Sequence, residues 1–595
     1  MKKIPVISVL LFITAGMVFW GCRQPVSPPE KAIAQSLLVQ VDSFSAISNV
    51  FLQEVEKSPA NERKLQDLFL QTRMAYKTIE WATEYFVPAT SRFVNGPPVQ
   101  EVEMASRQVF EPAGLQVIEG YLFPKYDSTR KTELIKQLTL LQGACGKYRT
   151  HFGNIDIFDW QVFDAAKLEV FRIESLGITG FDDPLTQMSM EESAAALKSL
   201  KNVLAHYTDA GNVMGAFDKT TGYLIDHPDF NSFNRAEFIT GYANALTADL
   251  TDLEEALKIH IIRYNRLLNQ DAKTLFDSNA FNVNAYSPDP SSFVTDKKIA
   301  LGKTLFSDPI LSGSGTRSCQ SCHQPEKAFT DGLVKNTVID KLQSLQRNTP
   351  TLLNAALQPS QFYDLRVNTL EDQSHNVVQN DKEMHGDLNV SVKKLWNAPL
   401  YRTLFSAAFP NNDRTGIDTL EVMNAIGSYV RSLTLLNSRF DEYMRGNKTV
   451  MSNNEVNGFN LFMGKAKCAT CHYMPLFNGT FPPRYIKSES EVIGVPRSLA
   501  NDSIDSDIGR FDVMQIAAYR HAFKTPALRN AARTAPYMHN GVYSTLDQVL
   551  DFYNAGGGVG LGLKIDNQTL PFDKLNLTVK EREDVIAFIR SLDSH

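Results

Sequence analysis

"RSCQSCHQ" at residues 317–324 returns as "AKCATCHY" at residues 466–473, so the chain carries two cysteine pairs that are each followed at once by a histidine. The first motif supplies Cys319, Cys322 and His323, and the second supplies Cys468, Cys471 and His472. Only two other cysteines occur, Cys22 and Cys145. In an oxidising compartment, neighbouring thiols without a ligand become disulfides, so both pairs are expected to bind a metal or a cofactor or to act in redox chemistry.

Three occupants are compatible with paired cysteines. A zinc site with four cysteine ligands could join the pairs, but it would leave the two histidines without a role and would need an unusually long spacing. A thioredoxin-like redox pair would lie in a βαβ pattern, which is absent. CxxCH is the signature of c-type haem attachment, in which two thiols hold the macrocycle and the histidine is presented to the iron. The sequence therefore predicts two covalently bound haem c groups, with His323 and His472 as iron ligands.

Composition excludes several other classes of protein. The chain has 595 residues, is 43% hydrophobic and has a net charge of -6. It can bury several cores, because one domain usually takes about 100–200 residues. Lysine and arginine are spread without a basic run, so no nucleic-acid partner is expected.

The N-terminus has the features of an export signal. Lys2 and Lys3 precede an apolar stretch from Ile4 to Trp20, which is shorter than the roughly 20 residues of a spanning helix. Gly21-Cys22 resembles a bacterial lipoprotein cleavage site. We predict a signal peptide over residues 1–21, lipid on Cys22, a Pro-rich linker over 22–30 and a membrane-tethered location in the periplasm; the alternative is an uncleaved anchor.

The rest of the chain predicts an all-α architecture. Residues 31–280 show apolar residues at helical spacing and are expected to form a helical bundle, followed by a linker over 281–297. Two cytochrome c-like domains are expected over 298–445 and 446–595, because a capped short helix precedes each CxxCH motif. The end, "LTVKEREDVIAFIRSL" (577–592), opens with a capping box of Thr578 and Glu581.

From about residue 285 onwards the sequence resembles the bacterial dihaem cytochrome c peroxidase family, including its MauG-like branch. The matching stretches are "RNTPTLLNAALQPSQFYDLRVNTLEDQ" (347–373), "NDKEMHG" (380–386) and "FKTPALRNAARTAPYMHNG" (523–541). The resemblance implies two packed, mostly helical cytochrome c domains, with hydrogen peroxide reduced at the first haem and electrons entering through the second. It further implies a small cytochrome c or a copper protein as exported electron donor, and a possible homodimer.

The resemblance also assigns roles at the first haem. It places the distal acid/base at Glu383 and a distal companion at Gln373; a carboxylate there can move a proton between the two peroxide oxygens. Tyr363 stands where typical members have a tryptophan that relays electrons between the haems. Plain packing is the alternative for Tyr363, and a solvated surface acid is the alternative for Glu383.

Two departures from the typical pattern concern the axial ligands. Residues 324–347 contain no histidine, whereas typical members have one there that caps the first iron until the other haem is reduced. The first haem is therefore predicted to be open; His375 and His385 are expected to be solvated. Twelve residues after Gly541, where typical members have a methionine ligand of the second haem, stands Tyr553, as in MauG-like members. Met538 or Met474 is the alternative ligand.

A calcium ion usually lies between the two domains of this family. Its protein ligands match Asn348 by side chain and Thr534 and Pro536 by backbone carbonyl, all of them oxygen donors of the kind calcium prefers. His539 is expected near the second haem, bonded to a propionate.

The sequence of residues 31–280 gives less information about function. "GLQVIEGYLFP" (114–124) and "LGITGFDDP" (176–184) resemble segments of imelysin-like proteins. Gln116 stands where the metal-binding histidine of that family would be, beside Glu119, so docking or scaffolding is the expected role of this half. For the whole chain, the alternatives to a peroxidase are a MauG-like oxidase that modifies a partner protein and a dihaem electron carrier or sensor without turnover.

Overall fold

The computed structural model describes residues 28–57, 59–103, 106–208, 210–410 and 415–595. The predicted signal peptide, the predicted lipid on Cys22 and most of the 22–30 linker lie outside the described residues. Within the described part of the chain, no helix is long and apolar enough to cross a membrane. The described chain is mostly helical with two short strand pairs, which confirms the all-α class.

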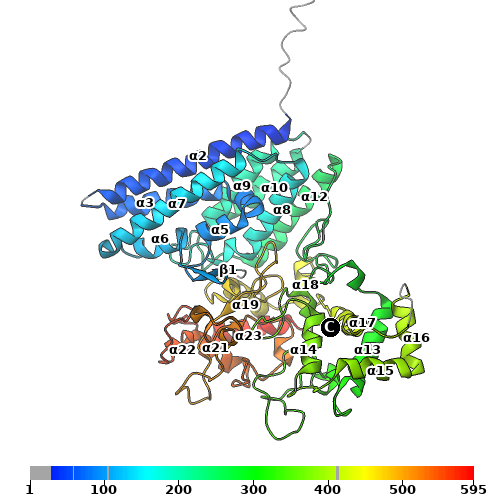
Figure 1. The fold of residues 1–595 in the computed structure, drawn as a ribbon. Coiled ribbons are helices and arrows are strands. Elements are labelled where there is room, and N and C mark those ends of the chain that lie inside the picture. The colour runs from blue at the N-terminus through cyan, green and yellow to red at the C-terminus, as the bar shows by residue number, and fades with distance from the viewer. Residues whose placement is uncertain (1–27, 58, 104–105, 209, 411–414) are drawn as a thin grey trace, which may run out of the picture.

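The first half of the described chain is a helical bundle. Its longest helices, α2 (Pro29–Glu56) and α7 (Lys131–Phe152), pack against each other and α3 (Glu62–Lys77) packs on α2 (Figure 1). The remaining elements of this half are α4 (Glu80–Phe86), α5 (Pro88–Asn95), α6 (Leu115–Leu122), α8 (Asp159–Ser175), α9 (Ser189–Leu204), α10 (Gly211–Asp226), α11 (Arg235–Phe238), the π-helical turn Ile239–Ala243, α12 (Asn244–Ala256), and the antiparallel strands β1 (Glu101–Glu103) and β2 (Gln108–Phe110).

The two CxxCH segments lie side by side beneath this bundle (Figure 1). The first CxxCH segment (298–445) holds α14 (Leu370–Gln379), α15 (Leu388–Asn397), α16 (Pro399–Ala408), α17 (Thr419–Arg431) and α18 (Arg439–Met444), and α13 (Asp296–Ser307) leads into it. The second CxxCH segment (446–595) holds α19 (Asn453–Met463), α20 (Phe511–Met514), α21 (Leu546–Asn554), α22 (Gly557–Gly560) and α23 (Val579–Ser591), with the antiparallel strands β3 (Ser490–Glu491) and β4 (Phe523–Lys524).

Both CxxCH segments are built around the same helix crossing. In the first, Gly302 of α13 lies against α17 so closely that a Cβ there would collide with the carbonyl oxygen of Ala425. In the second, Gly458 of α19 meets the carbonyl oxygen of Asp584 on α23 in the same way. A glycine is needed at each point because any side chain would push the helices apart. The short helix before each motif is thus packed on a later helix of its own segment, α17 in the first and α23 in the second.

The predicted helix caps are present. Thr295 caps α13 by accepting a hydrogen bond from the backbone N–H of Lys298. Thr578 and Glu581 form the predicted capping box at the start of α23. The face of α23 predicted to be apolar is buried; its members are Val585, Phe588, Ile589 and Leu592.

The helical half and the second CxxCH segment share one hydrophobic core. A continuous cluster of buried side chains runs from Phe44 and Phe163 in the bundle to Phe462 and Phe588 in the second CxxCH segment. The first CxxCH segment has two further clusters of its own. Because an apolar core resists separation, the bundle and the second CxxCH segment are expected to move as one body.

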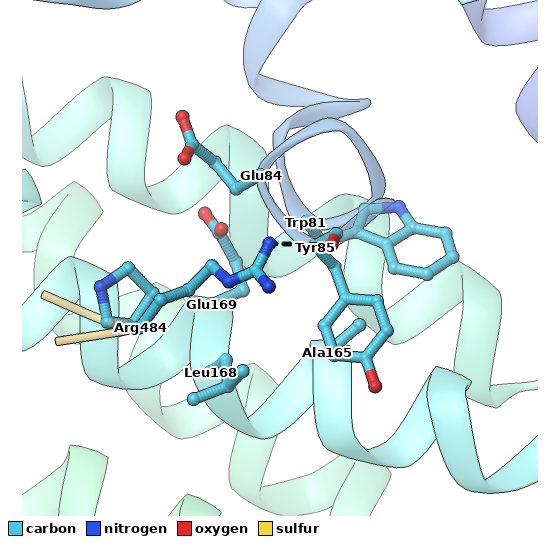
Figure 2. A pocket seen from close by; sticks show the side chains of 8 residues that line it. Trp81, Glu84, Tyr85, Ala165, Leu168, Glu169 and Arg484 are labelled. Atoms are coloured by element: carbon cyan, nitrogen blue, oxygen red, sulfur yellow. Dashed lines mark hydrogen bonds between the residues drawn. The ribbon is translucent and has the colours of Figure 1, made fainter. Parts of the chain in front are cut away.

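Polar contacts reinforce this junction. Arg484, from the second CxxCH segment, reaches between α4 and α8, where its Nη1 atom lies 3.5 Å from the backbone oxygen of Tyr85 (Figure 2). Glu84 and Glu169 line the same small pocket. Burial raises the pKa of Glu84 to about 7 and that of Glu169 well above its ordinary value.

Candidate haem and peroxide site

The first motif lies on a 3-10 turn, Cys319–Ser321, and its residues have the chemistry of a haem c site. Both thiols are free. The Nδ1 atom of His323 lies 3.0 Å from the carbonyl oxygen of Phe329, so its Nε2 atom is the nitrogen available to a metal. Burial lowers the pKa of His323, which favours the neutral imidazole that binds iron.

The second motif repeats this arrangement on the 3-10 turn Cys468–Thr470. Cys468 and Cys471 are free, and the Nδ1 atom of His472 lies 3.1 Å from the carbonyl oxygen of Pro526. Burial lowers the pKa of His472 to about 4. Two free thiols and one oriented, neutral histidine in each motif fit two covalently attached haem c groups, and they do not fit a single zinc site joined across the segments.

Glu383 lies on a tight loop, residues 380–386, which we call the acid loop. The side chain of Asn380 organises it: Nδ2 donates to Oε1 of Glu383 at 2.9 Å, and Oδ1 accepts from the N–H of Lys382 at 2.9 Å. Gly386 closes the loop, since its N–H donates to the Val378 carbonyl and a Cβ would collide with the carbonyl oxygen of Leu311. The carboxyl group is thus held in one orientation by its own loop.

The electrostatic surroundings of Glu383 suit proton transfer. Burial raises the pKa of its carboxyl group, and the charges of Arg366 and Arg317 oppose that rise. The backbone oxygen of Glu383 accepts a hydrogen bond from Nη1 of Arg317 at 3.1 Å, and Arg317 stands two residues before Cys319, so the acid loop is tied to the first motif. A carboxyl group whose pKa is raised by burial is a better proton acceptor than an ordinary carboxylate, and it can return the proton as a general acid.

Gln373 is half-buried on α14, one helix before the acid loop. The two histidines of this region are exposed: His375 lies on α14, and His385 lies 3.1 Å from the carboxylate of Asp381 at the surface. Their exposure agrees with the expectation that both are solvated.

Tyr363 lies where the two CxxCH segments meet. Its backbone oxygen accepts from the N–H of Lys524 on β4 at 2.7 Å, and burial raises the pKa of its phenol. Nearby, Arg347 joins the segments by ion pairs to Asp364 at 2.6 Å and Asp507 at 2.7 Å. The phenol oxygen of Tyr363 has no hydrogen-bond acceptor among the described side chains, so a relay that releases its proton would need water.

Tyr553 lies on α21, in the second CxxCH segment. Burial raises the pKa of its phenol, and the charges of Cys471, Cys468 and Glu491 raise that pKa further. Met474 follows the second motif and is fully buried. The predicted ligand and one of its alternatives therefore both lie in the second CxxCH segment, and the choice of Tyr553 as ligand stays a prediction.

The residues predicted to hold calcium come from two segments that meet. The N–H of Asn348 donates to the carbonyl oxygen of His539 at 2.7 Å, which brings the 347–373 stretch against the 523–541 stretch containing Thr534 and Pro536. The side chain of Asn348 donates to the carbonyl oxygen of Leu333 at 2.8 Å. Among the described residues, no group of three or more His, Cys, Asp or Glu side chains is placed to hold a metal ion.

His539 does not face solvent. Its ring stacks on Phe523 with centroids 3.7 Å apart, and its Nε2 atom lies 3.3 Å from the carboxylate of Asp505. The carboxylate holds the imidazole in place between the two CxxCH segments.

The helical half reaches the second motif directly, which the sequence did not reveal. Phe181 packs edge-on against Tyr473, the residue after His472, with ring centroids 6.1 Å apart. Arg92 lies over the Phe481 ring at 4.6 Å and pairs with Glu489 at 3.0 Å. These contacts cover one side of the second haem site with the bundle.

In the bundle, the residues singled out for their likeness to imelysin are buried and bonded. The side-chain amide nitrogen of Gln116, Nε2, donates to the carbonyl oxygen of Asn95 at 3.0 Å. Glu119 accepts from the N–H and the hydroxyl of Thr186 at 2.8 and 2.7 Å through one carboxyl oxygen. The resemblance to imelysin remains a prediction.

The fold and the two motifs define a helical c-type protein with two haem sites. Comparison with known proteins narrows this class: the family described as di-haem cytochrome c peroxidase matches residues 296–449. The methylamine utilization protein MauG of Methylorubrum extorquens is 34% identical over 301 residues, which is 50% of this chain and 79% of that protein. The cytochrome c551 peroxidase of Nitrosomonas europaea is 35% identical over 42% of this chain and 71% of its own length.

A third relative, the cytochrome c peroxidase of Escherichia coli, is 30% identical over 62% of this chain and 76% of its own length. The chain belongs to the di-haem cytochrome c peroxidase family, as the resemblance predicted. Membership implies two c-type haems, in agreement with the donor sets of the two motifs.

Proposed function

We propose that this protein is a dihaem peroxidase that reduces hydrogen peroxide to water with electrons from an exported redox protein. The reaction consumes one peroxide, two electrons and two protons and forms two waters. The observation that supports the assignment most directly is the half-buried carboxyl group of Glu383, which is fixed by Asn380 and whose backbone oxygen accepts a hydrogen bond from Arg317, two residues before Cys319 of the first motif.

A haem held by Cys319, Cys322 and His323 would supply the coordination position and one of the two electrons for peroxide reduction, and the second haem would supply the other electron. Glu383 would accept a proton from one peroxide oxygen and return it to the other, which would leave as water when the O–O bond breaks. Gln373 orients the bound peroxide by a hydrogen bond. Since residues 324–347 contain no histidine, peroxide has access to this site without displacing a protein ligand.

Electrons enter at the haem held by Cys468, Cys471 and His472. Tyr553 would supply a further ligand to this haem, because the anionic oxygen of a phenolate would stabilise the ferric state and lower the reduction potential. Tyr363, between the two segments, carries electrons from this haem to the first one. The donor is a small cytochrome c or a copper protein.

The test is peroxide consumption by the purified dihaem protein, with a small cytochrome c as donor. The proposal expects turnover that depends on both the donor and Glu383. Peroxide consumption that is unchanged by Glu383→Gln would instead favour an electron-carrier or sensor role. The consumption would then be a slow reaction of the haems alone, without a protein acid/base.

A MauG-like oxidase is the second candidate, and two features of the sequence favour it: the tyrosine at position 553 and the absence of histidine from residues 324–347. Such an enzyme uses peroxide to oxidise a partner protein. Incubation with peroxide and extracts of the source cells separates the two: oxidative cross-links in one partner support the oxidase, whereas donor oxidation alone supports the peroxidase.

Several further features belong to the same proposal. The protein is tethered in the periplasm by lipid on Cys22, calcium binds at Asn348, Thr534 and Pro536, and the chain can form a homodimer. The proposed units are 31–280, 298–445 and 446–595. Calcium is supported by the meeting of the two segments that carry its ligands, and elemental analysis of dialysed protein tests it.

A further inference from the structure

Arg317 stands two residues before Cys319, and its guanidinium group reaches two other segments. Nη1 donates to the backbone oxygen of Glu383 at 3.1 Å. Nη2 donates to the backbone oxygens of Thr337 and Val338 at 3.1 and 3.2 Å. One side chain therefore ties the first haem motif to the acid loop and to residues 336–345.

Residues 336–345, which we call the ribbon, fold back on themselves. Thr337 pairs with Ser344, and the N–H of Leu345 donates to the Asn336 carbonyl at 2.7 Å. At the base of the ribbon, Asn336 Nδ2 donates to the carboxylate of Asp331 at 2.8 Å and lies 3.4 Å from the sulfur of Cys322. The ribbon is thus anchored at the same motif from which Arg317 extends.

The ribbon also contacts the acid loop without the help of a side chain. The N–H of Ile339 donates to the carbonyl oxygen of Lys382 at 3.0 Å, one residue before Glu383. The acid loop is therefore held at two adjacent residues: by the ribbon at Lys382 and by Arg317 at Glu383 itself. Asn380 fixes the carboxyl group within the loop.

The chemistry of arginine suits this position. A guanidinium group is a planar fork with five N–H donors, so it can satisfy carbonyl groups from two segments at once, whereas an ammonium group on a flexible stem cannot match that geometry. Its permanent positive charge also stabilises the ionised form of Glu383, the form that accepts a proton.

We propose that Arg317 is a positioning residue for the peroxide reaction, which holds the Glu383 carboxyl group and the ribbon in a fixed relation to the first haem motif. The proposal rests on the peroxidase function proposed above. It goes beyond that function in assigning the placement of the acid/base to a side chain that hydrogen-bonds to backbone carbonyls of the acid loop and the ribbon.

The test compares Arg317→Gln, Arg317→Lys and wild type as purified dihaem proteins with equal haem content. Arg445→Gln is the matched control, since Arg445 also donates to two backbone carbonyls, those of Phe276 and Leu436 at 2.6 and 2.7 Å, away from the first motif. The rate constant of the reaction with peroxide is measured by stopped flow across pH. Hydrogen exchange of the ribbon and the acid loop is measured by mass spectrometry.

Arg317→Gln is expected to slow the peroxide reaction by about 10- to 100-fold, because small misplacements of a catalytic group have effects of that size. Exchange should become faster in the ribbon and the acid loop, and the acid limb of the pH profile should move to higher pH, because a positive charge near Glu383 is lost. Arg317→Lys should fall between, and Arg445→Gln should leave the rate constant and both segments unchanged.

A double-mutant cycle with Glu383→Gln separates this inference from the peroxidase assignment. If Arg317 acts through Glu383, Arg317→Gln has no further effect once Glu383 is replaced. Two results would overturn the positioning role and leave the peroxidase assignment intact. One is that Arg317→Gln slows the peroxide reaction equally in the wild-type and the Glu383→Gln backgrounds. The other is that Arg317→Gln has the wild-type rate constant and wild-type hydrogen exchange. If Arg317→Gln fails to incorporate haem, Arg317→Lys with wild-type rate and exchange overturns it equally. No effect of Glu383→Gln alone would count against the proposed function itself.

Discussion

Replacement of Glu383 by glutamine removes the proposed acid/base and little else. The amide keeps a carbonyl oxygen in the place of Oε1, so the 2.9 Å hydrogen bond from Asn380 can persist and the acid loop should keep its shape. What is lost is the ability to take and return a proton. General acid–base catalysis contributes about 10²- to 10⁴-fold to a rate. At about 1.36 kcal/mol for each factor of ten, the barrier should rise by about 2.7–5.4 kcal/mol.

The assay is stopped-flow mixing of the one-electron-reduced protein with stoichiometric hydrogen peroxide at several pH values. Burial raises the pKa of Glu383, against the opposing charges of Arg366 and Arg317. Since the ionised form accepts the proton, the wild-type rate should fall as the pH drops through this raised pKa. That acid limb should be absent in Glu383→Gln.

Asp381→Asn is the matched control, because Asp381 lies on the same loop but is exposed beside His385. It should react at the wild-type rate with the wild-type pH profile. A Glu383→Gln protein within about twofold of wild type, with its acid limb retained, would refute the assignment of Glu383, since that result lies far below the contribution expected of an acid/base.

Three other substitutions test the remaining parts of the account. Tyr363→Phe should slow electron transfer between the haems if the phenol is oxidised on the way, and flash or stopped-flow reduction kinetics equal to wild type would leave Tyr363 as packing only. Tyr553→Phe should raise the midpoint potential of the second haem and change its ferric spectrum, because the oxygen donor is lost; an unchanged spectrum would favour Met474 as ligand. Asp441→Ala should lower the free energy of unfolding by about 3–5 kcal/mol, since it strands the buried charge of Arg529, which Asp441 meets at 2.7 Å; a loss below about 1 kcal/mol in denaturant titrations would contradict this reading.

The parts of the fold that could be predicted from sequence are those governed by local chemistry. The capping box of Thr578 and Glu581 and the cap at Thr295 follow from hydrogen bonding within four residues, and both are present. The CxxCH spacing is likewise local, since one turn of chain brings the thiols and the histidine together. Family membership followed from ordered blocks of sequence rather than from any single residue.

The contacts between distant segments could not be predicted in this way. The common core of the bundle and the second CxxCH segment joins apolar faces hundreds of residues apart, and nothing in the periodicity of either says which face it will meet. Arg92 and Phe181 look like ordinary helix and loop residues until Glu489 and Tyr473 lie against them. The role of Arg317 could not be predicted because its partners are backbone carbonyls, which every residue carries and which leave no signal in the sequence.

Asn380 is a different case, because its role had a local signal. An asparagine three residues before a glutamate can bond to it across a turn, and the pair Asn380 and Glu383 does so. The axial role of Tyr553 and the relay role of Tyr363 remain predictions.

The central claim is that the first haem site reduces peroxide and is open in the resting protein. Mixing the wild-type protein with one equivalent of hydrogen peroxide, in the fully ferric form and in the one-electron-reduced form, tests it most directly when both haem bands are followed. The account predicts fast oxidation in both forms, because no histidine in residues 324–347 blocks the first iron. Absence of reaction in both forms would contradict the peroxidase assignment, and reaction of the reduced form alone would contradict the open site.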